Sequence, residues 1–160
     1  MSRIEISSFI NAPQERVFDL ARSIDLHVSG FETGHHYAIG GVTKGLIGAG
    51  EQVEWRGKAF GLWWKHRSEI VIYDRPVHFR DTMIQGAFKR YNHDHYFEGH
   101  NGGTRMRDVV EFEAPAGPVG KIVDRILIHG YLYRLILQRS ETIRAAAESD
   151  LWKQYIPHQN

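Results

Sequence analysis

The sequence contains no cysteine, which excludes disulfide bonds, thiolate nucleophiles and cysteine-ligated metal sites. It also lacks any apolar run long enough to cross a membrane. Its first residues, Met1 to Ile6, alternate polar and apolar side chains, whereas a signal peptide needs an uninterrupted apolar stretch. We therefore expect a cytoplasmic protein without stable membrane insertion.

Neither sign of charge predominates, because basic and acidic residues are interspersed and leave a net charge of only +1. This balance argues against a nucleic-acid partner. The sequence carries no nucleophile motif, phosphate-binding loop or cofactor fingerprint, so we expect no bound cofactor. With 160 residues, 42% of them hydrophobic, the chain has the size and composition of one globular domain spanning residues 1–160.

Alternating apolar residues from Ile4 to Ile10 predict a first strand. Pro13 follows directly and suits the first turn of a helix, where its missing N–H costs nothing. The apolar spacing after it predicts a short helix, and a second short helix ends before Gly30. From Thr33 to Ala114, glycines and tight turns separate runs with a period of two. This pattern predicts six further strands in an antiparallel meander.

After Pro118 the apolar period becomes helical and continues without proline from about Val119 to Ala147. That span predicts one helix of about 30 residues, roughly 45 Å long. Its wide apolar stripe needs a large partner, and the meander is the only candidate. The predicted fold is therefore α+β, a curved antiparallel sheet of about seven strands around a long C-terminal helix, with two short helices after the first strand.

Several motifs along the chain carry a resemblance to a known superfamily. They are Ile10-Asn11-Ala12-Pro13 with Val17-Phe18, then Asp74-Arg75-Pro76 with Phe79-Arg80-Asp81, Gly86-Ala87-Phe88, His93-Asp94-His95-Tyr96-Phe97, and the segment from Gly102 to Asp108 before the final helix. With this order of elements, the chain resembles the helix-grip (SRPBCC) superfamily, which includes START lipid-transfer domains and polyketide cyclases, and especially its small bacterial ligand-binding members. The resemblance implies the fold and an internal cavity. It implies no catalytic residue set, because the superfamily hosts carriers and enzymes alike.

The predicted hairpins bring four polar residues together. A tight turn between the last two strands places His95 opposite Asp108, and a three-residue loop between the two preceding strands sets Asp81 opposite His93. Cross-strand neighbours lie about 4.5–5.5 Å apart at Cβ. These four residues, called the quartet below, are therefore expected to form one patch on the face of the sheet toward the helix.

Three interpretations of the quartet remain open. It can be a buried network in which two carboxylates hold two imidazoles. It can be a polar anchor for a mostly apolar ligand. It can also be a metal or acid–base site, although a metal site without cysteine would need an unusual His/Asp set, and we therefore assign no metal.

A second group of residues predicts a cavity between sheet and helix. Aromatic residues are frequent on the sheet, and Gly130 lies inside the helix, where it either packs closely or leaves room for a ligand. The expected lining is Trp55, Trp64, His66, Phe79, Met83, Phe97 and Met106, and with the quartet and Gly130 these are the candidate ligand-binding residues. His35 and His36 are interpreted as a loop or strand start rather than as ligands.

The function favoured by this pattern is binding of a small hydrophobic or aromatic molecule in the cavity by a monomer or homodimer. The alternative is a polyketide cyclase/dehydrase-like enzyme that uses a His–Asp pair to move protons. A protein–protein adaptor whose cavity is filled by side chains is a third possibility. The sequence does not decide whether the chain is an enzyme.

Overall fold

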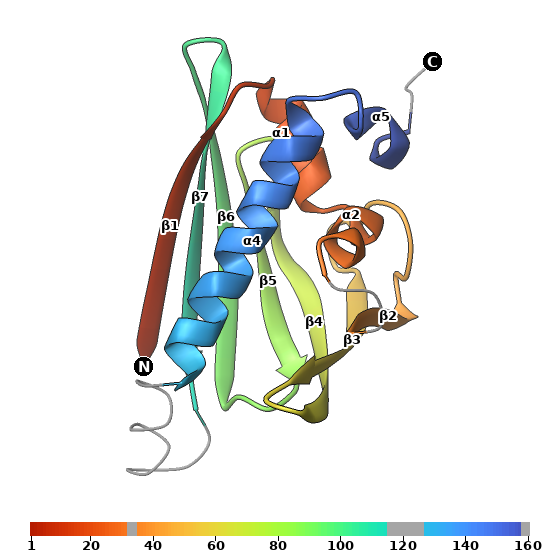
Figure 1. The fold of residues 1–160 in the computed structure, drawn as a ribbon, viewed down its shortest axis with the longest axis vertical. Helices are drawn as coiled ribbons and strands as arrows, with labels where there is room; N and C mark the ends of the chain where they lie inside the picture. The colour runs from red at the N-terminus through yellow and green to blue at the C-terminus, as the bar shows by residue number, and fades with distance from the viewer. Residues whose placement is uncertain (32–34, 115–126, 158–160) are drawn as a thin grey trace.

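The computed structural model describes residues 1–31, 35–114 and 127–157 (Figure 1). Seven strands form one sheet, and short helices follow the first strand. The elements are β1 (Ser2–Ile10), α1 (Gln14–Ala21), α2 (Ile24–Ser29), β2 (His36–Gly41), β3 (Gln52–Ala59), β4 (Leu62–Asp74), β5 (His78–Gln85), β6 (Arg90–His100), β7 (Gly103–Glu113), α4 (His129–Ala147) and α5 (Trp152–Tyr155). This arrangement is the predicted α+β helix-grip fold.

The strands lie in the order β1-β7-β6-β5-β4-β3-β2, and every neighbouring pair is antiparallel. The meander thus runs from β2 to β7, and β1 pairs with β7 at its far edge. The β6–β7 hairpin turns through Asn101 and Gly102, both with positive φ, which is the conformation that two-residue hairpin loops demand. This loop fixes the predicted register, with His95 opposite Asp108.

Helix α4 crosses one face of the sheet, with α1 and α2 beside it (Figure 1). It ends at Ala147, as predicted, and its apolar stripe buries Leu132, Ile136 and Ile143. The predicted start at residues 119 to 126 lies outside the described residues. None of the described helices combines the length and the apolar character that crossing a membrane requires.

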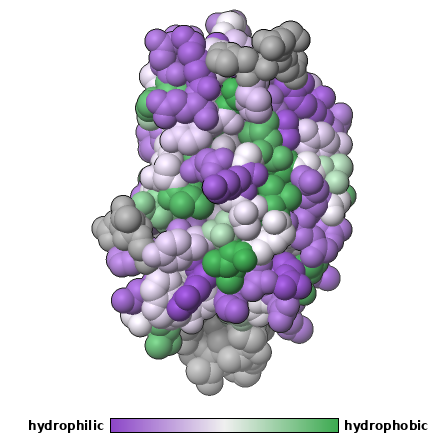
Figure 2. Space-filling view, turned by 90° about the vertical axis from the view of Figure 1, so that its right-hand side faces the viewer, coloured by the Kyte–Doolittle hydropathy of each residue, from purple (hydrophilic) through white to green (hydrophobic). Residues whose placement is uncertain are grey.

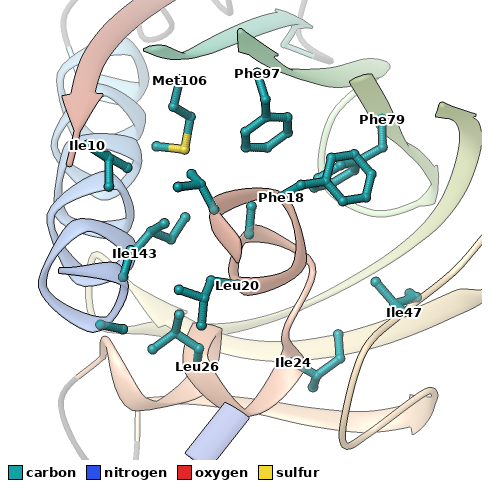
Figure 3. Close-up of a cluster of buried hydrophobic side chains, with 14 of the residues drawn as sticks. Ile10, Phe18, Leu20, Ile24, Leu26, Ile47, Phe79, Phe97, Met106 and Ile143 are labelled. Atoms are coloured by element: carbon teal, nitrogen blue, oxygen red, sulfur yellow. The ribbon is translucent and has the colours of Figure 1, made fainter. Parts of the chain in front are cut away.

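Aromatic and aliphatic side chains fill the core beneath α1 (Figure 3). The ring of Phe18 lies 5.2 Å from that of Phe97 and 5.3 Å from that of Phe79, both edge-on, and Met106 packs in the same cluster. Burying an aromatic side chain stabilises the fold by about 1.5–3 kcal/mol. Helix α1 therefore fills part of the space between the sheet and α4 with its buried side chains.

Candidate functional site

The quartet, on β5, β6 and β7, is a chain of three short hydrogen bonds that runs from Asp81 through His95 and Asp108 to His93. His95 Nδ1 lies 2.6 Å from Asp108 Oδ1, and His95 Nε2 lies 3.0 Å from Asp81 Oδ2. His93 Nε2 lies 2.9 Å from the same Asp108 oxygen. His93, His95 and Asp108 are buried. The predicted contacts within the quartet are confirmed, and they follow from the ladder that pairs Asp81 with His93 and His95 with Asp108.

The hydrogen bonds determine the charge of His95. Both of its ring nitrogens face carboxylate oxygens, and an ionised carboxylate can only accept a hydrogen bond. His95 must therefore donate from both nitrogens, as an imidazolium. Burial alone would raise the pKa values of Asp81 and Asp108, but the hydrogen bonds from the imidazoles hold both well below their usual range.

His93 is in a different state. Its pKa is lowered, first because burial disfavours the charged ring and then because of the positive charge of His95. Its Nε2 faces Asp108 and carries the proton of the neutral ring. Its Nδ1 therefore bears a free lone pair, and the nearest carboxylate oxygen, Oδ2 of Asp81, is 3.9 Å away.

Arg139 of α4 completes the cluster and was not predicted. Its Nη1 lies 3.1 Å from Nδ1 and 3.5 Å from Nε2 of His95. An atom in the plane of the ring could not be that close to both nitrogens without colliding with Cε1. Nη1 therefore lies over the face of the His95 ring. Its Nη2 donates to the carbonyl oxygen of Ala21. Two carboxylates, one imidazolium and one guanidinium sum to zero charge. The sequence did hold a signal, because Arg139 interrupts the apolar stripe between Ile136 and Ile143.

A cavity of about 410 Å³ lies beside this cluster. It extends from the junction of α1 and α2 to the β3–β4 hairpin, and α4 forms one wall. Six of the candidate residues line it, namely Trp55, Trp64, His66, Phe79, Asp81 and His93. From α4 and the residue before it, the cavity receives Ile128, Tyr131, Leu132, Leu135, Ile136 and Arg139. The cavity is therefore mostly aromatic and aliphatic, with Asp81, His93 and Arg139 as a polar side.

The other candidate residues lie elsewhere. Phe97 and Met106 were expected in the cavity wall, and this is wrong, because Phe18 of α1 covers them in the filled core. Met83 is also absent from the wall. It packs on the cluster around Phe112, and its sulfur lies over Gly86 of the β5–β6 turn, where a Cβ would come within 2.5 Å of it.

His95 and Asp108 form hydrogen bonds with the cavity residues Asp81 and His93 but do not themselves line the cavity. They therefore hold Asp81 and His93, the polar residues of the cavity wall, in place by hydrogen bonds from outside the wall. At Gly130, in the first turn of α4, the position that a Cβ would take has no atom within 4 Å apart from the chain neighbours and the backbone of the helix itself. It is neither a close-packing glycine nor part of the wall.

Two further histidines line the cavity without having been predicted there. His36 begins β2, as its interpretation as a strand start expected, but its ring is buried, with Nε2 3.2 Å from Nε2 of His27 on α2. Burial lowers the pKa of His27 well below its usual value. Burial, and then the charge of His66, lowers the pKa of His36 to about 4. No periodicity relates α2 to β2, so the pairing left no signal in the sequence.

Trp64 contributes an unpaired hydrogen-bond donor to the cavity wall. Its indole Nε1–H is buried, and it is the one such side-chain atom among the described residues that has no hydrogen-bond partner. Its ring lies over Gly57, where a Cβ would come within 2.7 Å of Cζ2. Leaving a buried donor unpaired costs about 1–3 kcal/mol.

The donor atoms of Asp81, His93 and His95 lie within 4.8 Å of one another, close enough to approach one cation. In this structure the His95 nitrogens are already engaged with the two carboxylates. The guanidinium of Arg139 adds a positive charge 3.1 Å from the same ring. A cation would have to displace a proton and face that charge, so the residues fit a proton network better than a metal site.

No protein-family model matches the chain, and no curated protein matches it in sequence. Solved structures do match. TTHA0849 from Thermus thermophilus is 21% identical, covers 91% of this chain and 99% of its own, and superimposes with a TM-score of 0.67. CV1439 from Chromobacterium violaceum is 15% identical, with 94% and 100% covered and a TM-score of 0.68.

A plant protein has the same architecture. Ginseng major latex-like protein 151 from Panax ginseng is 15% identical, with 91% of this chain and 97% of its own chain covered and a TM-score of 0.66. At these identities the likeness shows the fold alone. The helix-grip architecture is thus shared across these proteins, and the function has to be argued from the cavity.

Proposed function

We propose that this protein binds a small, flat, mostly apolar molecule in the cavity between the sheet and α4, and that His93 and Asp81 orient it. The observation that carries the proposal is the placement of an internally neutralised polar cluster at one side of an aromatic cavity of about 410 Å³. Ligand sites of about 300–1,000 Å³ with few polar groups are typical of small-molecule binding.

The walls support a flat aromatic guest. Trp55, Trp64, Phe79, Phe88 and Tyr91 all line the cavity, and aromatic rings pack favourably against other rings face-on or edge-on. Because their side chains have few rotatable bonds, ordering them around a guest costs little conformational entropy.

The polar groups favour an uncharged guest with a hydrogen-bond donor. Arg139 and His95 already neutralise the two carboxylates, so no net charge is left for an ionic guest to pair with. The lone pair on His93 Nδ1 and the Asp81 carboxylate can accept from a hydroxyl or N–H. The unpaired Trp64 N–H can in turn donate to an oxygen of the guest.

Filling the cavity tests the proposal directly. Leu135 lines the cavity, whereas Leu137, two residues further on α4, is exposed. We expect Leu135→Trp to weaken binding of 1-naphthol, measured by isothermal titration calorimetry, by at least about tenfold, while the matched Leu137→Trp leaves the affinity within about twofold. Equal affinities for both variants would contradict the proposal. Native mass spectrometry of the purified wild type then searches for the natural guest.

A second candidate function is acid–base catalysis, and the state of His93 favours it. Its Nε2–H is held by Asp108 while its Nδ1 is unprotonated, and the residue lines the cavity. In this arrangement Nδ1 can remove a proton from a bound substrate, and Asp108 stabilises the imidazolium that forms. This is the arrangement expected of the cyclase/dehydrase-like alternative.

Recovery of the guest separates the two functions. A binding protein returns the molecule identified by mass spectrometry unchanged after incubation. An enzyme converts it, and His93→Gln abolishes the conversion because the amide cannot take up the proton.

A further inference from the structure

The tip of the β3–β4 hairpin exposes large apolar side chains at the end of the molecule. Phe60 is 63% exposed, Leu62 72% and Trp63 46%. All three lie at the β3–β4 turn within four successive positions, so their exposed surface is concentrated at one tip of the sheet. An exposed cluster of this kind marks an interaction site more often than single apolar residues do.

The backbone at Phe60 is unusual. Phe60 has φ of 52°, and Gly61 after it has φ of 76°. A two-residue hairpin loop requires this left-handed conformation, which glycine and asparagine adopt easily and a bulky aromatic residue does not. The ring reaches Tyr131 of α4, 5.2 Å between centroids, yet it remains mostly exposed. Packing therefore does not account for an aromatic residue at this strained position.

Basic residues surround this patch. Residues 56–65 contain Arg56, Lys58 and Lys65 and no acidic residue. Arg56 and Lys58 lie over the Trp63 ring, 4.6 Å and 5.9 Å from its centroid. The β5–β6 turn adds Lys89 and Arg90, and Figure 1 shows it at the same end of the molecule as the hairpin tip and the first turn of α4.

Among the described residues, two carboxylates lie within ion-pair distance of these five bases, since Glu54 lies 3.8 Å from Lys65 and Glu113 lies 2.9 Å from Lys89. These seven side chains therefore carry a net charge of +3, although the whole chain carries only +1. On the side of β2 and α2, Figure 2 shows apolar patches interrupted by hydrophilic side chains.

We propose that this end docks on an anionic phospholipid bilayer, with Phe60, Leu62 and Trp63 entering the headgroup region and the surrounding bases contacting the lipid phosphates. Aromatic and aliphatic tips flanked by lysine and arginine suit the membrane interface. A second copy of the chain is the less suitable occupant, because pairing two such surfaces would bring like charges together.

The same three apolar residues also line the cavity. Docking would therefore place the rim of the cavity at the boundary between headgroups and acyl chains, from which an apolar guest could enter without crossing bulk water. The docking surface can nevertheless be tested without any guest, so its failure and that of the proposed binding function are distinguishable.

The test measures co-sedimentation with vesicles of equal parts phosphatidylglycerol and phosphatidylcholine, and with vesicles of phosphatidylcholine alone. We expect the wild type to bind the anionic vesicles and to be released by salt. Phe60→Asn/Leu62→Ser should lose at least about tenfold in affinity, and so should Arg56→Gln/Lys58→Gln, since each basic residue near the surface contributes substantially. Asparagine suits the left-handed turn, so the first variant is expected to fold.

The matched control is Phe9→Asn/Val71→Ser, which removes two half-exposed apolar side chains away from the hairpin tip and should bind as the wild type does. Three results would overturn the proposal: no binding of the wild type to anionic vesicles, equal loss in the control, or a dimer in light scattering that the Phe60→Asn/Leu62→Ser variant dissolves. The last result would assign the surface to a second copy.

Discussion

Nδ1 of His95 lies 2.6 Å from Oδ1 of Asp108, directly across the β6–β7 ladder. The opposite nitrogen of the same ring reaches Asp81, so His95 bridges two carboxylates with its own positive charge. Arg139 supplies a second positive charge, with Nη1 3.1 Å from His95 Nδ1 and 3.8 Å from Asp108 Oδ1. This neutral assembly holds His93 as an uncharged imidazole at the edge of an apolar cavity, and that state is what binding or proton transfer would use.

Replacing Asp108 by Asn should destabilise the fold strongly. The imidazolium of His95 would lose one of its two counter-charges inside the protein, and breaking a buried ion pair in this way costs about 3–5 kcal/mol. Urea unfolding monitored by circular dichroism measures the change. Glu98→Gln, which alters an exposed carboxylate on β6, should stay within about 0.5 kcal/mol of the wild type. A loss below about 1 kcal/mol in Asp108→Asn would contradict the network.

Stability should fall as the solution is acidified from pH 7. His27, His36, His66 and His93 all have lowered pKa values in the folded protein, with burial as the largest cause for each. The unfolded chain takes up these protons near pH 6.5 and the folded one at lower pH, so stability is complete above about pH 6.5 and is lost below it.

Each such proton contributes a slope of about 1.4 kcal/mol per pH unit. For His36, whose folded pKa is about 4, the loss is complete near that pH. Below about pH 4 the lowered pKa values of Asp81 and Asp108 extend the decline. Unfolding free energies at pH 7, 6 and 5 test this order, and His66→Phe should reduce the slope. A flat profile in the wild type would be inconsistent with four histidines whose pKa values are lowered in the folded protein.

Trp64→Phe should separate stability from recognition. The substitution removes the unpaired indole N–H, so we expect the unfolding free energy to change by less than about 1 kcal/mol, since the lost packing offsets the relieved cost of the buried donor. We expect the wild type to bind 1,4-naphthoquinone, which carries only acceptors, more tightly than naphthalene. That preference should disappear in Trp64→Phe. If the preference persists in the variant, Trp64 does not contact the guest.

Parity and turn length were sufficient to predict the quartet. Side chains two apart on a strand share a face, and the β6–β7 turn then decides that His95 faces Asp108. Both arguments use only residues close together in the sequence. They suffice in an antiparallel meander because strands that follow one another in the chain pair with each other. The predicted end of α4 at Ala147 rests on the same kind of pattern.

The contributions of the helices could not be predicted in this way. Arg139 reaches His95 because of how α4 crosses the sheet, and His27 reaches His36 because of how α2 packs on β2. Phe97 and Met106 lie on the same face of the sheet as the cavity residues, but they are buried in the core cluster with Phe18 of α1. The alternation of side chains along a strand predicts on which face of the sheet each one lies. Only the packing of the helices decides which parts of that face remain open as a cavity.

The most direct test follows the imidazole nitrogens of His93 by NMR during a titration with 1-naphthol. Before ligand is added, we expect a neutral ring at pH 7 with the proton on Nε2. On saturation, the Nδ1 signal should move toward the position of a hydrogen-bonded acceptor, and naphthalene, which has no hydroxyl, should leave it in place. A saturable complex with 1-naphthol that leaves the His93 Nδ1 signal unmoved, or no complex at all, would contradict the proposed role of His93 in orienting the guest.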